Sequence, residues 1–100
     1  MKALDIVILD MRKQVNFTDF FVICSGNTDR QVHAIADHIN VRLQELGVKT
    51  SFRKNSGNKE WVVLDAGDVV SHTFQKQARE FYQLEYLWRE AKQVAWEESS

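Results

Sequence analysis

The first quarter of the chain holds two short runs of apolar side chains separated by a polar stretch. Residues 5–11 and 19–25 are rich in Ile, Val and Phe, and each run is too short for a typical helix. Apolar character that is nearly continuous is typical of strands covered on both faces. The pattern therefore predicts two strands within a sheet that is layered with helices.

Apolar residues take up helical spacing after the break at Ser25-Gly26-Asn27. Thr28 and Gln31 have the spacing of a capping box, and Gly47 is a typical left-handed stop. Between them, one face carries the apolar residues Val32, Ile35, Ala36, Ile39, Leu43 and Leu46. The sequence predicts an amphipathic helix between Thr28 and Gly47.

Three extended segments and a second helical pattern complete the chain. Residues 48–53 form a weak strand candidate at a sheet edge, and residues 60–65 and 69–74 read as two strands. Gly67 allows a short hairpin between the last two. Helical spacing from 76 to 96 then predicts a long helix, whose apolar stripe holds Ala78, Phe81, Leu84, Trp88, Ala91 and Ala95.

The order strand, strand, helix, strand, strand, strand, helix predicts the fold class. It is an α/β (α+β) fold with a mixed sheet of about five strands covered by helices. We assign residues 1–88 to this domain and residues 89–100 to a C-terminal helical extension, since the last turns exceed what a small domain needs.

Composition narrows the class of protein further. One hundred residues with 44% hydrophobic and 27% charged residues fit one compact domain. A net charge of −1 argues against a module held on duplex nucleic acid mainly by phosphate contacts. There is no membrane-length apolar run and no secretory signal, and the single Cys24 fits a reducing compartment. We expect a cytoplasmic protein without membrane contact or direct sequence-specific binding of nucleic acid.

Residues that could ligate a metal or act as a nucleophile are sparse. His33 and His38 are five residues apart and point to different sides of the predicted helix, and His72 has no second ligand nearby. Cys24 ends an apolar strand and reads as an inert core thiol. The sequence predicts neither a metal site nor a cofactor.

A phosphate or nucleotide site has weak support. Ser25-Gly26-Asn27 occupies the place of a phosphate-binding loop but lacks the further glycines and the lysine of such loops. Asp65 and Asp68 flank a turn, and no two carboxylates share one strand face. A degenerate nucleotidyltransferase that uses Asp65, Asp68 and the Ser25-Gly26 turn stays open, although turn-capping residues explain the same pattern.

Large amphipathic aromatic residues favour protein recognition over catalysis. The chain has more of them than one small core readily hides: Trp61, Tyr82, Tyr86, Trp88 and Trp96. Such residues dominate binding hot spots. Arg53, Lys54 and Lys59 near Trp61 leave open a small ribosome-facing or nucleic-acid-facing patch, against the usual solvated loop.

Several segments together resemble the Iojap-like family, the ribosomal silencing factors. The likeness keeps the same order from about residue 2 to residue 88, and it is carried by residues 5–11, 18–27, 29–32, 35–37, 61–72 and 78–88. The resemblance implies a mixed α/β domain similar to nucleotidyltransferases but without their catalytic carboxylates. It also implies a translation repressor, not an enzyme.

The family's function gives the expected partner and site. Its members bind the large ribosomal subunit at ribosomal protein fourteen and block subunit joining, they are commonly homodimers, and organelle relatives are linked to large-subunit assembly. For this chain the resemblance implies a docking surface on the last hairpin and the following helix. Our candidates are Trp61, Asp68, His72, Arg79, Tyr82 and Trp88. We expect aromatic anchoring from Trp61 and Tyr82 and charge complementarity from Asp68 and Arg79, with Trp88 divided between core and surface.

The sequence departs from the family pattern in three places. The family usually has one more helix before the first strand. It usually has an acidic residue and a glycine shortly before the tryptophan, where this chain has Lys54-Asn55. Residues 89–100 extend past the usual end and have no assigned role.

Overall fold

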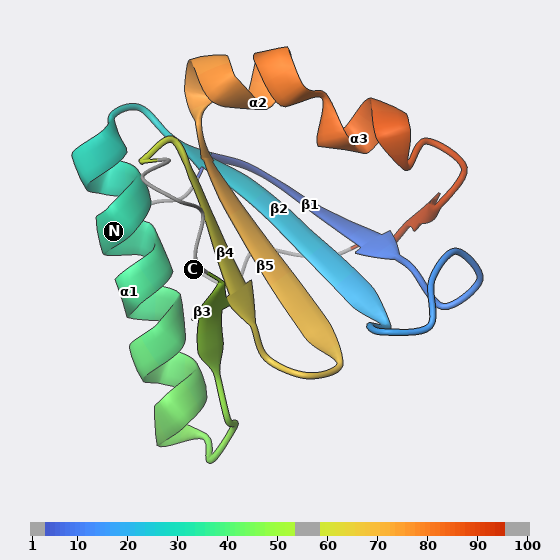
Figure 1. The fold of residues 1–100 in the computed structure, drawn as a ribbon, viewed down its shortest axis with the longest axis horizontal. Helices are drawn as coiled ribbons and strands as arrows, with labels where there is room; N and C mark the ends of the chain where they lie inside the picture. The colour runs from blue at the N-terminus through green and yellow to red at the C-terminus, as the bar shows by residue number, and fades with distance from the viewer. Residues whose placement is uncertain (1–3, 54–58, 96–100) are drawn as a thin grey trace.

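The fold is one mixed β-sheet with helices on both sides (Figure 1). The computed structural model describes residues 4–53 and 59–95. In chain order the elements are β1 (Leu4–Asp10), β2 (Phe20–Gly26), α1 (Asp29–Glu45), β3 (Ser51–Arg53), β4 (Trp61–Asp65), β5 (Val69–Gln75), α2 (Lys76–Tyr82), α3 (Leu84–Leu87) and β6 (Lys92–Gln93). The six strands are ordered β3-β4-β5-β2-β1-β6, with β2 and β5 parallel and every other pair antiparallel. The expected fold class is confirmed, including the edge position of β3.

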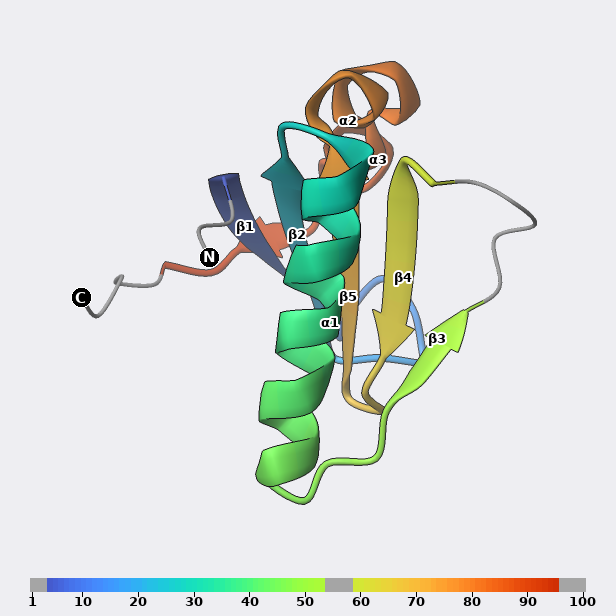
Figure 2. The same ribbon diagram turned by 90° about the vertical axis from the view of Figure 1, so that its left-hand side faces the viewer.

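Helix α1 begins and ends where its capping residues predict. The Thr28 hydroxyl accepts a hydrogen bond from the Gln31 backbone N–H (3.1 Å), and the Gln31 side chain accepts one from the Asn27 N–H (2.6 Å). Gly47 has a φ of +81°, the left-handed conformation in which glycine has no Cβ penalty. The helix lies along the face of β2, β5 and β4 (Figure 2).

Gly26 has a packing role at the turn from β2 into α1. A Cβ atom at this position would lie 3.1 Å from the backbone nitrogen of Val32. The glycine therefore lets the first turn of α1 approach the end of β2 closely. This accounts for Ser25-Gly26-Asn27 as a tight strand-to-helix connection.

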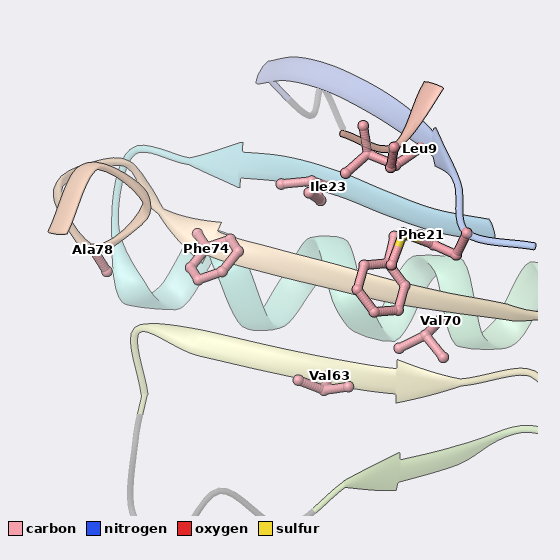
Figure 3. Packing of buried hydrophobic residues seen from close by; sticks show 9 residues of the cluster. Leu9, Phe21, Ile23, Val63, Val70, Phe74 and Ala78 are labelled. Carbon is pink, nitrogen blue, oxygen red and sulfur yellow. The ribbon is translucent and has the colours of Figure 1, made fainter. Parts of the chain in front are cut away.

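The main hydrophobic core lies on the face of the sheet away from α1 (Figure 3). Because side chains alternate along a strand, Val22 and Cys24 face α1 while Phe21 and Ile23 face the other way. Ile23 and Phe74 are fully buried. Figure 3 shows these side chains among the other buried residues of the cluster, Leu9, Val63, Val70 and Ala78.

The C-terminal quarter of the chain differs from the single long helix expected over residues 76–96. α2 ends at Tyr82 because Gln83 takes a left-handed conformation (φ +48°), and only a short α3 follows. Lys92–Gln93 then form β6, which pairs with the end of β1. The expectation of helix in residues 89–95 is therefore wrong, whereas the domain boundary at residue 88 stays a prediction.

The apolar stripe of this quarter is only partly a core stripe. Ala78 and Ala91 are buried, and Leu84 and Trp88 pack on the core. Phe81, which shares the predicted stripe with these residues, is 81% exposed. Trp96 and the Lys54-Asn55 departure lie outside the described residues.

The pairing of Asp10 with Arg12 gives a testable pH dependence. Hydrogen bonds from the Arg12 side chain (2.6 and 3.0 Å) and backbone N–H (3.1 Å) lower the pKa of Asp10 from 3.8 to about 2. A carboxylate with a lowered folded-state pKa stabilises the fold above its unfolded pKa, and this contribution is lost as the pH falls through the folded pKa. We expect Asp10→Asn to be less stable than the parent protein at neutral pH, with the difference disappearing between about pH 4 and about pH 2.

Urea unfolding of both proteins across this pH range measures the effect. A stability difference that stays constant down to the lowest pH would contradict the role of the Asp10 carboxylate.

Within residues 4–53 and 59–95, no helix is both long enough and apolar enough to cross a membrane. In the same ranges, no three His, Cys, Asp or Glu side chains are grouped so as to hold a metal ion.

Candidate functional site

Four aromatic side chains from three elements form a cluster on the face of the sheet away from α1, which we call the aromatic cluster: Trp61, His72, Phe74 and Tyr82. Trp61 of β4 pairs with Phe74 of β5 in the register of the hairpin, and their rings stack with centroids 4.9 Å apart. Tyr82, at the end of α2, lies 5.1 Å from the Trp61 ring. The last hairpin and the following helix thus meet at Trp61.

His72 orients the indole ring of Trp61. The Trp61 Nε1–H donates a hydrogen bond to His72 Nδ1 (3.1 Å). His72 is buried, with its ring edge-on to Phe21 at 4.6 Å. An indole fixed by stacking and by a hydrogen bond loses little conformational entropy on binding, which suits an anchor.

Trp88 extends the packing towards the core. Its ring meets Phe21 edge-on with centroids 6.1 Å apart, and it packs against the buried cluster. Of the two roles considered for Trp88, a core residue or a surface contact, these contacts favour the core.

α2 and α3 also expose four large apolar side chains, which together we call the α2–α3 ridge. It consists of Phe81 (81% exposed), Tyr82 (41%), Tyr86 (62%) and Leu87 (66%). Phe81 meets Tyr82 edge-on at 5.2 Å, which joins the ridge to the cluster. Large exposed apolar side chains, aromatic ones above all, are typical of interaction surfaces.

Arg79 acts within the fold as a clamp between α2, α3 and β2. Its Nε donates to the Glu85 carboxylate (2.7 Å) and its Nη1 donates to Ser25 Oγ (2.8 Å). The side chain is only 12% exposed. It holds α3 against the end of β2 and thereby fixes the position of the α2–α3 ridge.

Removal of the clamp should destabilise the protein. We expect Arg79→Met to lower the free energy of unfolding by about 1–3 kcal/mol, because it leaves the buried Ser25 hydroxyl without its charged donor. The matched control is Arg89→Met, since Arg89 is exposed and stacks over Tyr86 at 4.5 Å. That variant should stay within about 1 kcal/mol of the parent. Equal losses in urea unfolding of the two variants would contradict the clamp.

Asp68 immediately precedes β5, in the turn of the hairpin. This turn lies at the opposite end of β5 from α2 (Figure 1). Its side chain is exposed, while its backbone carbonyl accepts hydrogen bonds from the N–H groups of Asp19 (2.8 Å) and Phe20 (3.1 Å). Asp68 is therefore separated from the aromatic cluster, which contains the candidates Trp61, His72 and Tyr82.

The same geometry removes the nucleotidyltransferase site considered above. Ser25 lies five residues along β2 from Phe20, whose N–H bonds to Asp68, a span of about 17 Å. The Asp65 carboxylate accepts a hydrogen bond from the Gly67 N–H (2.9 Å), as turn-capping carboxylates do. Asp65, Asp68 and the Ser25-Gly26 turn therefore do not converge on one site.

Cys24 behaves as the core thiol that the sequence predicts. Burial raises the pKa of its thiol, against smaller opposing effects of a contact to Thr73 and the charge of Arg79. A raised pKa keeps the group protonated and unreactive.

Sequence reasoning missed Phe74 as the centre of the aromatic cluster and Phe81 and Leu87 as members of the ridge. The alternation of Val70, His72 and Phe74 along β5 could have placed Phe74 beside His72. The exposure of Phe81 had no comparable signal, because it depends on where α2 ends.

Comparisons with known proteins give one family. The model of the family described as "Ribosomal silencing factor during starvation" matches residues 1–100. The ribosomal silencing factor of Bacillus subtilis is 42% identical over 90 residues, which is 90% of this chain and 76% of that protein. A crystal structure of a Chromobacterium violaceum protein superposes with a TM-score of 0.82 at 33% identity and covers 98% of this chain and 81% of that one.

A relative from an animal is also similar. The mouse protein named "Mitochondrial assembly of ribosomal large subunit protein 1" is 32% identical over 89 residues. The matched region is 86% of this chain and 39% of the mouse protein.

Proposed function

Because this chain belongs to the family of ribosomal silencing factors, we propose that it represses translation by binding the large ribosomal subunit at ribosomal protein fourteen. The observation that carries the proposal is the match of the family model over all 100 residues. The described surface adds support, because it carries packed and partly exposed aromatic rings of the kind that protein partners use.

The proposed docking site joins the aromatic cluster to the α2–α3 ridge. Trp61 and Tyr82 are the proposed anchors, since each combines a large ring with partial exposure and a fixed position. His72 holds the Trp61 ring through a hydrogen bond, Trp88 packs on Phe21 beneath the site, and Arg79 holds α3 in place. Asp68 is proposed as a separate charged contact at the hairpin turn.

The proposed mechanism is steric exclusion. The chain measures 34 × 33 × 33 Å along its principal axes. A body of this size on the face of the large subunit that meets the small subunit would separate the two by several times the width of a direct contact. Repression then needs no chemical step, only occupancy of that surface.

Co-sedimentation tests the proposal. The purified protein is incubated with isolated large subunits, isolated small subunits and joined ribosomes, and each mixture is pelleted. We expect retention on large subunits alone. Retention on small subunits or on joined ribosomes with equal efficiency, or on no particle, would contradict it.

A role in assembly of the large subunit is the second candidate, favoured by the similarity to the mouse protein named for that process. Both roles would use the same docking site. Immature large subunits that lack late-assembling proteins distinguish them, because an assembly factor should bind these particles more tightly than mature ones.

Two further expectations belong to the same proposal. The protein would act in the cytoplasm, where bacterial subunits join, and it would form homodimers as family members commonly do. Light scattering after size-exclusion chromatography measures the second directly, and a monomer at all concentrations would contradict it.

A further inference from the structure

A cavity of about 340 Å³ lies between α1 and the sheet, on the opposite side of the sheet from the proposed docking site. Its walls are Ile35, Ile39 and Leu43 of α1 and Val22, Val69 and Ser71 of the sheet. α1 packs chiefly over β4, β5 and β2 (Figure 2). The cavity extends along the side of the helix as far as Ile6 of β1.

The size and lining of this cavity match those of small-molecule sites. Ligand cavities usually measure about 300–1,000 Å³ and are mostly apolar with a few placed polar groups. An apolar cavity of about 150 Å³ is enough to bind a benzene ring. The space beside α1 is therefore large enough for a molecule of about two fused rings.

One polar group in the cavity has no partner. Ser71 is 6% exposed, and its Oγ makes no hydrogen bond to any described residue. A buried hydroxyl without a partner costs free energy, which a ligand with one hydrogen-bonding group would recover. The other buried polar atom of the lining, Cys24 Sγ, already contacts the Thr73 hydroxyl at 3.7 Å.

We propose that this cavity binds a neutral, largely hydrocarbon molecule of about bicyclic size that carries one hydroxyl group. The hydrocarbon part would pack against the side chains of α1, and the hydroxyl would bond to Ser71 Oγ. The ligand is neutral because no Lys, Arg, Asp or Glu lines the cavity, and the one imidazole of the lining, that of His38, is exposed to solvent. A charged group there would lose its hydration without a counter-charge. This site is independent of ribosome binding, because it lies on the other face of the sheet.

The test uses 2-naphthol as the probe and naphthalene as the matched hydrocarbon. Each is titrated into the full chain, and methyl and amide NMR signals are followed. We expect saturable shifts centred on the methyl groups of Val22, Ile39 and Leu43. Ser71→Ala should weaken binding of 2-naphthol roughly five- to ten-fold and leave binding of naphthalene unchanged.

Two controls keep the outcome clear. Ser71→Ala is expected to fold at least as stably as the parent, because the hydroxyl has no partner to lose. Leu43→Trp fills the cavity from the partly exposed face of α1 and should abolish binding of both probes while the spectrum stays that of a folded protein.

Three results would overturn the proposal. They are an absence of shifts at these methyl groups with both probes at millimolar concentration, shifts confined to another part of the protein, and a Ser71→Ala effect that is equal for the two probes. Concentration-dependent dimerisation that Leu43→Trp removes would overturn it as well, since the cavity would then be an interface between two copies.

Discussion

Replacing Trp61 with alanine is expected to lower the affinity of the protein for the large subunit by about 2 kcal/mol or more, which is about 30-fold. Trp61 is held by stacking on Phe74 and by the hydrogen bond to His72, so its ring is already in a fixed position before binding. Truncation removes both the contact area and this fixed geometry. Fluorescence anisotropy of labelled protein against isolated large subunits measures the change.

The control must separate binding from folding, because Trp61 also packs within the chain. Leu46→Ala truncates an exposed apolar side chain away from the site, since Leu46 is 75% exposed at the end of α1, outside the proposed docking site. It should bind normally. The free energy of unfolding of each variant in urea shows whether it is folded. A folded Trp61→Ala protein that binds as tightly as the parent, or an equal loss in Leu46→Ala, would contradict the proposed docking site.

The largest stability effect is expected from Phe74→Ala. Phe74 is fully buried at the centre of the cluster and contacts Trp61, His72 and Tyr82. Removing a buried phenyl ring leaves a cavity, and such changes cost about 3–5 kcal/mol. Small domains have only about 5–15 kcal/mol in total, so the variant should unfold at much lower urea concentration.

Phe81→Ala makes the same chemical change at an exposed position. Phe81 is 81% exposed, so its truncation should change the free energy of unfolding by no more than about 0.5 kcal/mol. Similar losses in the two variants would show that burial does not distinguish these positions and would contradict the described core.

Local signals in the sequence were sufficient for the first two thirds of the fold. Thr28 and Gln31 predicted the start of α1, and Gly47 predicted its end, because capping bonds and a left-handed glycine depend on neighbouring residues only. Gly67, with a φ of +79°, did the same for the hairpin between β4 and β5. The boundaries of these elements depend on interactions within a few residues, so they can be predicted from one sequence.

The C-terminal quarter could not be predicted in this way. Helical spacing continues past Tyr82, yet Gln83 turns the chain in a left-handed conformation without a glycine to announce it. The clamp of Arg79 on Glu85 and Ser25 stabilises that turn, and its two partners lie 6 and 54 residues away in sequence. β6 likewise depends on pairing with β1. Tertiary contacts decide this segment, and spacing alone does not reveal them.

The candidate site was predictable in composition but not in arrangement. Trp61, His72 and Tyr82 do come together, because the hairpin register and α2 bring them to one face. Asp68 belongs to the same hairpin but lies at its turn, away from the aromatic cluster. The residue type alone does not show at which end of the hairpin a candidate lies. Arg79 is expected to offer its charge to a partner, whereas its side chain is only 12% exposed and bonds to Glu85 and Ser25 within the chain.

The most direct test of the central claim measures subunit joining by light scattering, with large and small subunits mixed at increasing concentrations of the protein. Steric exclusion predicts that the protein raises the apparent dissociation constant of the two subunits by a multiplying factor. This factor is one plus the ratio of the free protein concentration to the Kd of the protein for the large subunit, so it is about ten-fold at ten times that Kd. Trp61→Ala should need about 30 times more protein for the same inhibition. Subunits that join normally while the protein stays bound to the joined ribosome would contradict the account.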